Sequence, residues 1–197
     1  DGQTNSGEND AFITKFNTDG IKEWSRLLGS SRDDSGSALT TGSDGSIYIA
    51  GSTDGDLDGQ TNNGYSDAFI SKFNPDGTKE WTKLFGTSDS ETAKALITGA
   101  DGSIYIAGST TGDLDGQTFN GGGDTFISKF NADGTKEWTR LLGTSDNEVG
   151  EALTTGADGS IYIAGNTLGD LDGQTKSGDY HDAFISKFTP DGTKAWT

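Results

Sequence analysis

Apolar residues occur in short runs that are separated by polar stretches rich in glycine and aspartate. One run is IYIA at 104–107, and the longer motif around it, DGSIYIAGSTTGDLDGQT at 101–118, recurs almost unchanged at 44–61 and 158–175. Turn sequences such as Asn74-Pro75-Asp76-Gly77 follow the runs, and Asp-Gly supplies the positive φ angles of a tight hairpin. No segment keeps a helical period over about ten residues. The pattern therefore predicts an all-β chain.

The chain is a repeat of about three and a half units of 57 residues. The four tryptophans are separated by 57, 57 and 58 residues, and the DGQT motif recurs every 57 residues. The tryptophans are Trp24, Trp81, Trp138 and Trp196, and the motifs begin at Asp1, Asp58, Asp115 and Asp172. The extra residue of the last unit therefore lies between Thr175 and Trp196, and the segment SGDYHD is its expected place. An insertion that is tolerated there indicates a surface loop.

The apolar runs and turn sequences of each full unit predict four strands. Strand one is expected at 38–42, with copies at 95–99 and 152–156, and strand two is the IYIA run. Strand three is expected at 68–73, with copies at 11–16, 125–130 and 183–188, and strand four at 78–86. The whole chain then holds 14 strands.

The predicted strands are apolar on both faces. On strand three, Phe69 and Phe73 point one way, whereas Ala68 and Ile70 point the other. A sheet with one solvated face would alternate apolar and polar positions. Sheets that are apolar on both faces are sandwiched between neighbours, as are the four-stranded antiparallel blades of a β-propeller.

This architecture predicts one propeller segment over residues 1–197. It divides into a half-blade at 1–29 and three blades at 36–86, 93–143 and 150–197. Both ends carry the strand three and four hairpin, so the two ends do not complete each other, and the segment is not expected to close a ring alone. We therefore expect it to be an excerpt of a longer repeat chain. The expected partners are further repeats of that chain or neighbouring copies.

Composition narrows the functional classes. The net charge is −17, which argues against nucleic acid because phosphates require Lys and Arg. The absence of cysteine excludes disulfides, thiolate metal sites and thiol catalysis. No apolar run approaches about 18 residues, so no transmembrane segment is expected.

The long loop between strands two and three is the candidate metal site. Its oxygen-bearing side chains occupy positions 1, 3, 5, 7 and 12 of a window, a spacing that suits Ca²⁺. In the first full unit these are Asp56, Asp58, Gln60, Asn62 and Asp67. The copies are Asp113, Asp115, Gln117 and Asp124 in the next unit, and Asp170, Asp172 and Gln174 in the last. Lys176 replaces the asparagine of the last copy, which should bind Ca²⁺ worst.

The same loops also fit a purely structural interpretation. Asp and Asn in glycine-rich loops often form turns with their own backbone, so the window alone leaves both interpretations open. The spacing also departs from an EF-hand, because Gly59 stands at position 4 and an aspartate replaces the glutamate at position 12.

The repeated aromatic residues favour packing over chemistry. A tryptophan at the same place in every unit is expected to pack between blades, although a sugar-stacking platform is the alternative. His181 is the only histidine and lies in the insertion, where a surface position is expected. The chain has no catalytic triad order and no phosphate-binding motif. Because every acidic pair is repeated in each unit, we predict that the protein is not an enzyme.

Two stretches resemble the SBBP β-propeller repeat of large bacterial surface and secreted proteins. They are DAFISKFNPDGTKEW at 67–81 and ALTTGADGSIYIAG at 152–165, and LDGQTN at 57–62 resembles cyanobacterial members in particular. The resemblance implies a non-enzymatic propeller in a long multidomain chain at the cell surface or outside the cell. We therefore expect a structural or adhesive scaffold whose partners are surface glycans or proteins. A lectin-like propeller is the first alternative and a hydrolase propeller the second.

Overall fold

The computed structural model describes residues 2–197; Asp1, the first residue of the partial DGQT motif, lies outside the described residues. The described chain forms fourteen strands and one short 3₁₀ turn, η1 (Leu171–Gly173). The half-blade consists of β1 (Ala11–Phe16) and β2 (Lys22–Leu28). The predicted all-β chain of 14 strands is confirmed.

Three four-stranded antiparallel sheets follow the half-blade, and we call them the first, second and third full blades. The first holds β3 (Asp34–Thr41), β4 (Ile47–Thr53), β5 (Asp67–Phe73) and β6 (Lys79–Phe85). The second holds β7 (Glu91–Thr98), β8 (Ile104–Thr110), β9 (Asp124–Phe130) and β10 (Lys136–Leu142). The third holds β11 (Glu148–Thr155), β12 (Ile161–Thr167), β13 (Asp182–Phe188) and β14 (Lys194–Trp196).

Strand one begins earlier than the sequence predicted. β3 starts at Asp34, which pairs with Thr53, and a bulge follows between Gly36 and Ala38. Small and polar residues fill this first part, so it lacks the apolar pattern from which the strand was predicted. A Cβ at Gly36 would lie 2.9 Å from the end of the Ile49 side chain, and Ala93 occupies the equivalent position of the second full blade.

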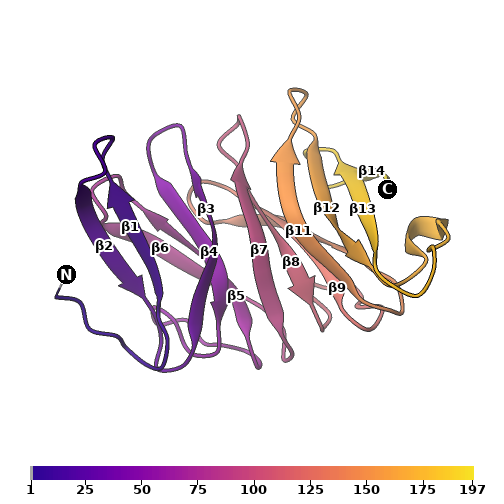
Figure 1. Ribbon diagram of the computed structural model, residues 1–197, viewed down its shortest axis with the longest axis horizontal. Helices are drawn as coiled ribbons and strands as arrows, with labels where there is room; N and C mark the ends of the chain where they lie inside the picture. The colour runs from indigo at the N-terminus through magenta and orange to yellow at the C-terminus, as the bar shows by residue number, and fades with distance from the viewer. Residues whose placement is uncertain (1) are drawn as a thin grey trace.

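The blades stack through both of their faces. Figure 1 shows them side by side in chain order, from β1 and β2 at one end to the third full blade at the other. Phe69 and Phe73 pack against Ala11 and Ile13 of the half-blade. The opposite face of the same strand, with Ile70, packs against residues of the second full blade. The predicted two-faced burial of strand three is thereby confirmed.

Three of the four strand-four tryptophans, Trp24, Trp81 and Trp138, lie at these blade junctions as predicted, whereas Trp196 is 46% exposed. Trp81 and Trp138 pack against the apolar clusters beside them. The indole N–H of Trp24 donates to the carbonyl oxygen of Pro75 at 3.2 Å, and Trp138 does the same to Pro190 at 3.3 Å. Each of these indoles therefore binds the hairpin turn of the following blade.

Candidate functional site on the loop face

Antiparallel strand order brings the long loops and the links between blades to one side of the row of blades. Each long loop joins strand two to strand three, and each link joins strand four to strand one of the next blade. The tight turns lie at the opposite side. The insertion of the last unit falls in the loop before Asp182, and His181 is exposed there.

The described residues include no helix that is long and apolar enough to cross a membrane.

The GDLDGQT motif folds into a small hairpin of its own. Leu57 and Gln60 exchange two backbone hydrogen bonds of 3.0 Å, and Asp58 and Gly59 between them have φ angles of 52° and 76°. Two successive positive φ angles define the tight turn that Asp-Gly favours. The leucine at the base of this hairpin is fully buried in each full blade. The motif is thus anchored by an apolar residue and presents its aspartate at the tip.

That aspartate binds the outer strand of its own blade. Asp58 accepts hydrogen bonds from the Lys79 ammonium and the Thr82 hydroxyl. Asp115 is bound by Lys136 and Thr139, and Asp172 by Lys194 and Thr197. Three of the predicted metal ligands therefore already have a cation, which is the lysine of strand four.

The glutamine of the motif covers the edge of the same strand. Gln60 donates to the Thr82 carbonyl oxygen at 2.5 Å and accepts from the Leu84 N–H at 3.1 Å. Gln3 makes the same pair of bonds to Ser25 and Leu27 in the half-blade, at 2.7 and 2.6 Å. Because strand four lies at the edge of its sheet, these bonds occupy backbone groups that another chain could pair with.

The other residues of the predicted calcium window have separate partners. Asp56 accepts from the Asn62 N–H at 2.9 Å, and the Asn62 amide donates to the Thr53 carbonyl oxygen at 2.9 Å. Asp113 and Asp170 make the equivalent bonds to Phe119 and Lys176. Asp67 lies outside the loop, at the first position of β5. Within residues 2–197, no three acidic or histidine side chains are grouped for a metal ion.

A pair of acids that the sequence pattern did not predict lies at each blade junction. Ser66 and Ser90 form a parallel bridge between two blades, and the Glu91 N–H donates to the Ser66 carbonyl oxygen at 2.7 Å. Asp67 and Glu91, the next residues, therefore lie side by side, and both side chains are 0% exposed. Asp124 and Glu148 repeat the arrangement, and Asp10 and Asp34 stand at the same positions of the first junction.

Only part of each acid pair is hydrogen-bonded. Asp67 Oδ2 accepts from the Asn63 backbone and side chain at 3.1 and 3.2 Å, whereas Oδ1 has no partner among residues 2–197. Glu91 accepts from Thr87 and from the Thr110 hydroxyl, the latter at 2.6 Å. Gly86 leaves room for both acids, because a Cβ there would lie 2.3 Å from Asp67 Oδ1 and 2.6 Å from Glu91 Oε2.

Burial shifts the titration of these groups. Removal from water raises the pKa of Asp67, although the Asn63 donors oppose the shift. Burial likewise raises the pKa of Glu91, and the nearby charge of Asp67 raises it further. The pKa of Asp124 is raised by burial and by the charge of Glu148. One sequence signal could have indicated the pairs: acids 24 residues apart recur at each junction, as Asp10 with Asp34, Asp67 with Glu91, and Asp124 with Glu148.

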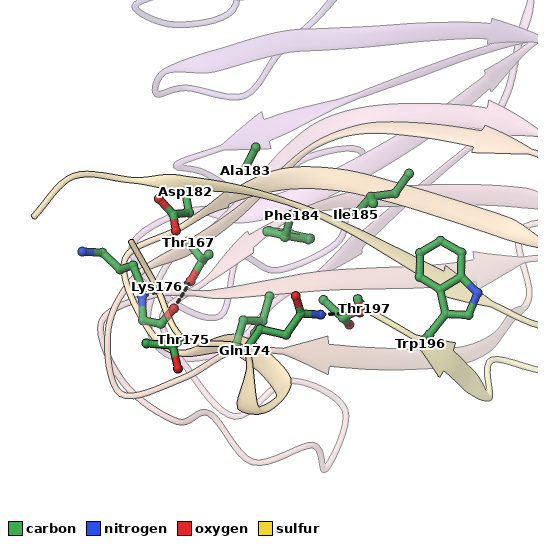
Figure 2. A pocket seen from close by; sticks show the side chains of 12 residues that line it. Thr167, Gln174, Thr175, Lys176, Asp182, Ala183, Phe184, Ile185, Trp196 and Thr197 are labelled. Atoms are coloured by element: carbon green, nitrogen blue, oxygen red, sulfur yellow. Dashed lines mark hydrogen bonds between the residues drawn. The ribbon is translucent and has the colours of Figure 1, made fainter. Parts of the chain in front are cut away.

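Two hollows lie near the loop of the third full blade. The first has a volume of 370 Å³ and is lined by Phe184, Ile185 and Trp196, with Gln174 bonded to Thr197 at its rim (Figure 2). β14 pairs with β13 at two positions only, whereas β6 pairs with β5 as far as Phe85. The first hollow therefore lies beside the part of β13 that β14 does not pair with.

The second hollow lies between a link and a long loop. It has a volume of 450 Å³ and includes Asp146 of the link and Asp170 of the loop, together with Lys176. At the preceding junction, Asp89 is close to the loop residue Gly112, whose added Cβ would lie 3.1 Å from Asp89 Oδ2. At two junctions, therefore, a link carboxylate lies near the start of a long loop.

Comparisons with known proteins identify the class of the fold. Residues 23–58 match the SBBP family, described as a beta-propeller repeat. Residues 42–80 and 99–137 match DUF5122, a beta-propeller domain of unknown function. These matches to β-propeller repeat models confirm the resemblance to SBBP-type repeats seen in the sequence.

Individual proteins are also similar to the chain. The regulatory protein FlaEY of Caulobacter vibrioides is 31% identical over 180 residues, which is 84% of this chain. The chain spans 19% of the length of that relative. A crystal structure of a protein of unknown function from Bacteroides caccae has a TM-score of 0.53 at 12% identity, covering 96% of this chain and 53% of its own. This second likeness concerns the fold alone.

Proposed function

We propose that the chain is a section of a β-propeller that serves as a non-enzymatic structural or adhesive scaffold in an exported bacterial surface protein. The proposal rests on the hydrogen bonds that the repeated polar residues make within their own blades. Asp58 and Gln60, with their copies, bind strand four of their own blade and hold the blade together. The same residues recur in every blade, whereas an active site needs groups that differ within one pocket.

The arrangement of strands supports closure around a central axis. β3, β7 and β11 are the first strands of successive blades, and each packs against the next. In a propeller these strands would line the central channel. We propose that the three full blades form part of such a ring.

Labelling of intact cells tests the location and the scaffold role. Antibodies against the 197-residue chain should label the bacterium that makes it without permeabilisation, while an antibody to a cytosolic protein should not. Labelling that requires permeabilisation would contradict a surface scaffold. A panel of glycosidase and esterase substrates should show no turnover, and turnover abolished by a substitution in one blade would favour the hydrolase alternative.

Two exposed aromatic residues support the lectin-like alternative. Tyr65 is 77% exposed and Tyr180 is 85% exposed, and both lie in long loops beside acidic residues. An exposed tyrosine ring can stack on a sugar while its hydroxyl binds water or a sugar hydroxyl. A glycan array with the wild-type chain and a chain carrying Tyr65→Ser and Tyr180→Ser tests this alternative. Binding that the double variant loses would favour the lectin.

We also propose that the chain binds Ca²⁺, through a ligand set that differs from the one predicted from the sequence. The second hollow supports it, because Asp146 and Asp170 both line that space. The corresponding residues at the preceding junction are Asp89 and Asp113. Lys176 adds a positive charge to the second hollow, which should make the last site the weakest. Titration calorimetry with Ca²⁺, compared with Asp113→Asn, tests this ligand set.

A further inference from the structure

Two of the loop residues that support the buried acids are asparagines followed by glycine. Asn63 precedes Gly64 and Asn120 precedes Gly121, and these are the two Asn-Gly steps of the whole sequence. Both asparagines are exposed, although the aspartates that they bind are buried. Each asparagine is therefore open to solvent and, at the same time, in contact with a blade junction.

Each asparagine holds its aspartate through two hydrogen bonds. The backbone N–H and the side-chain amide of Asn63 donate to Asp67 Oδ2 at 3.1 and 3.2 Å. Asn120 makes the same two bonds to Asp124 Oδ2, also at 3.1 and 3.2 Å. The other oxygen of each aspartate has no partner among residues 2–197. The asparagine is therefore the group that satisfies each buried carboxyl.

The outer units of the chain carry serine at this position. Ser6 in the half-blade donates its backbone N–H to Asp10 Oδ2 at 3.0 Å. Ser177 in the last unit donates its backbone N–H to Asp182 Oδ2 at 2.7 Å. The backbone bond is thus common to all four units, whereas a side-chain amide occurs at this position in the two middle units alone.

We propose that Asn63 and Asn120 deamidate spontaneously and that each reaction loosens the blade junction beside it. The backbone nitrogen of the following glycine gives its proton to water and attacks the side-chain Cγ. The bond from Cγ to the amide nitrogen breaks, ammonia leaves, and a cyclic imide forms. Water then opens the ring at either carbonyl group, which gives aspartate or isoaspartate. Overall, water is consumed and ammonia is released.

The residue after each asparagine favours this reaction. Glycine has no Cβ, so it hinders neither the approach of its nitrogen to Cγ nor the rotation that brings the two atoms together. The inference rests on the loop and the junction, and it is independent of the proposed scaffold function.

Deamidation places a carboxylate where an amide now donates. At the first of the two sites the amide nitrogen of Asn63 lies 3.2 Å from Asp67 Oδ2. An ionised carboxylate there has no hydrogen to donate, and its charge adds to the charges of Asp67 and Glu91. Isoaspartate also lengthens the main chain before Gly64. Both products therefore disturb a buried acid at the contact between two blades.

The second of the two sites should react first. The Gly64 N–H donates to Asn62 Oδ1 at 2.9 Å, and this bond restrains the attacking nitrogen. In the next unit Phe119 stands in place of that asparagine and offers no side-chain oxygen to Gly121. The nitrogen that attacks Asn120 is therefore less restrained.

Peptide mapping by mass spectrometry tests the chemistry, after incubation of the 197-residue chain at mildly alkaline pH. Asn120 should be converted first and Asn63 second, with isoaspartate among the products at both sites. Asn166 is the matched control, because it is exposed but followed by Thr167, and it should remain an amide over the same period. Conversion of Asn63 and Asn120 no faster than that of Asn166 would overturn the proposal. Conversion of Asn63 before Asn120 would overturn the restraint assigned to Asn62.

A serine variant tests the effect on the junctions. A chain with Asn63→Ser and Asn120→Ser copies the residues of the outer units and has no amide to lose there. The melting temperature of the wild type should fall by at least about 2 °C during the incubation, whereas the serine variant should keep its starting value. Asn63→Asp, which carries one product from the outset, should melt below the wild type, and the difference should shrink toward about pH 4, where the new carboxylate is protonated. An equal decline in the serine variant would overturn the proposal, and so would an unchanged melting temperature after conversion at both sites.

Discussion

Replacing Asp67 by asparagine should stabilise the protein at neutral pH. Asp67 is 0% exposed, and its Oδ1 lies unpartnered beside Glu91. Two ionised carboxylates in that position repel each other in a poorly solvated space. The asparagine amide has the same shape, keeps an oxygen for the Asn63 donors and turns an N–H group toward Glu91. The substitution therefore imitates a protonated Asp67.

The expected gain in the free energy of unfolding follows from the unpartnered Asp67 oxygen that is removed and the hydrogen bond to Glu91 that is formed. A buried acceptor that lacks a partner costs about 1–3 kcal/mol, and a hydrogen bond to a charged group contributes about 1.5–3 kcal/mol. We expect Asp67→Asn to raise the free energy of unfolding by about 1–3 kcal/mol at pH 7. In a chain of this size, each kcal/mol corresponds to about 2–4 °C in melting temperature.

The direction of the pKa shifts determines how the stability gain of Asp67→Asn varies with pH. The pKa of Asp67 and of Glu91 is raised in the folded protein, so folding favours their protonated forms. Their contribution to stability is fully present below the unfolded pKa, about 4, and is lost as the pH rises through the folded values. The gain from Asp67→Asn should therefore shrink as the pH falls toward about 4, where the wild type already carries the proton.

Urea unfolding at several pH values between neutrality and about pH 4 measures this. Asp89→Asn is the matched control, since it removes one negative charge at an exposed position of the neighbouring link. It should leave the pH slope unchanged. A loss of stability in Asp67→Asn at pH 7 would refute the argument, because it would show that the ionised form of Asp67 is the favoured one.

Four further outcomes test other parts of the structure. Phe69→Ala should cost about 3–5 kcal/mol in urea unfolding, since the ring is buried between two blades; a cost below about 1 kcal/mol would contradict that packing. Gly86→Ala should cost about 1–3 kcal/mol, because the new methyl group meets Asp67 and Glu91; an unchanged urea midpoint would show that the acids move aside. Asp58→Ala should cost about 1 kcal/mol and increase light scattering on storage, because the motif no longer covers strand four; Asp89→Ala is the control. Added Ca²⁺ should raise the melting temperature by mass action, and identical melting with and without a chelator would remove calcium from the proposed function.

The strands were predictable because burial on both faces marks them. In β5, Phe69 and Ile70 are apolar on opposite sides, and the Asp-Gly turn after them fixes where the hairpin reverses. The first part of β3 was missed, since its residues are small and polar and enter the sheet through backbone pairing with β4. Backbone pairing leaves no apolar signal in the sequence.

The calcium window remains a prediction, because the spacing of residues along a loop does not identify the partner of each carboxylate. Spacing along a loop shows which side chains are close in sequence, but Asp58 is held by Lys79, which lies 21 residues away. The oxygen spacing of the window is compatible with a cation in the loop and equally with a lysine from the neighbouring strand. The fold of the hairpin turns Asp58 toward β6 and thereby brings Lys79 and Thr82 to its carboxylate.

The buried acids show the limit of reasoning from one repeat. Asp182 stands at the same place in its unit as Asp67 and begins the same strand. Its carboxylate accepts from Ser177, yet it is only half-buried, because no following blade covers it within residues 2–197. Identical residues thus differ in environment according to whether the next blade brings a glutamate beside them. The acid pair is a property of the junction between two units, so it becomes visible only when each unit is considered together with the one that follows.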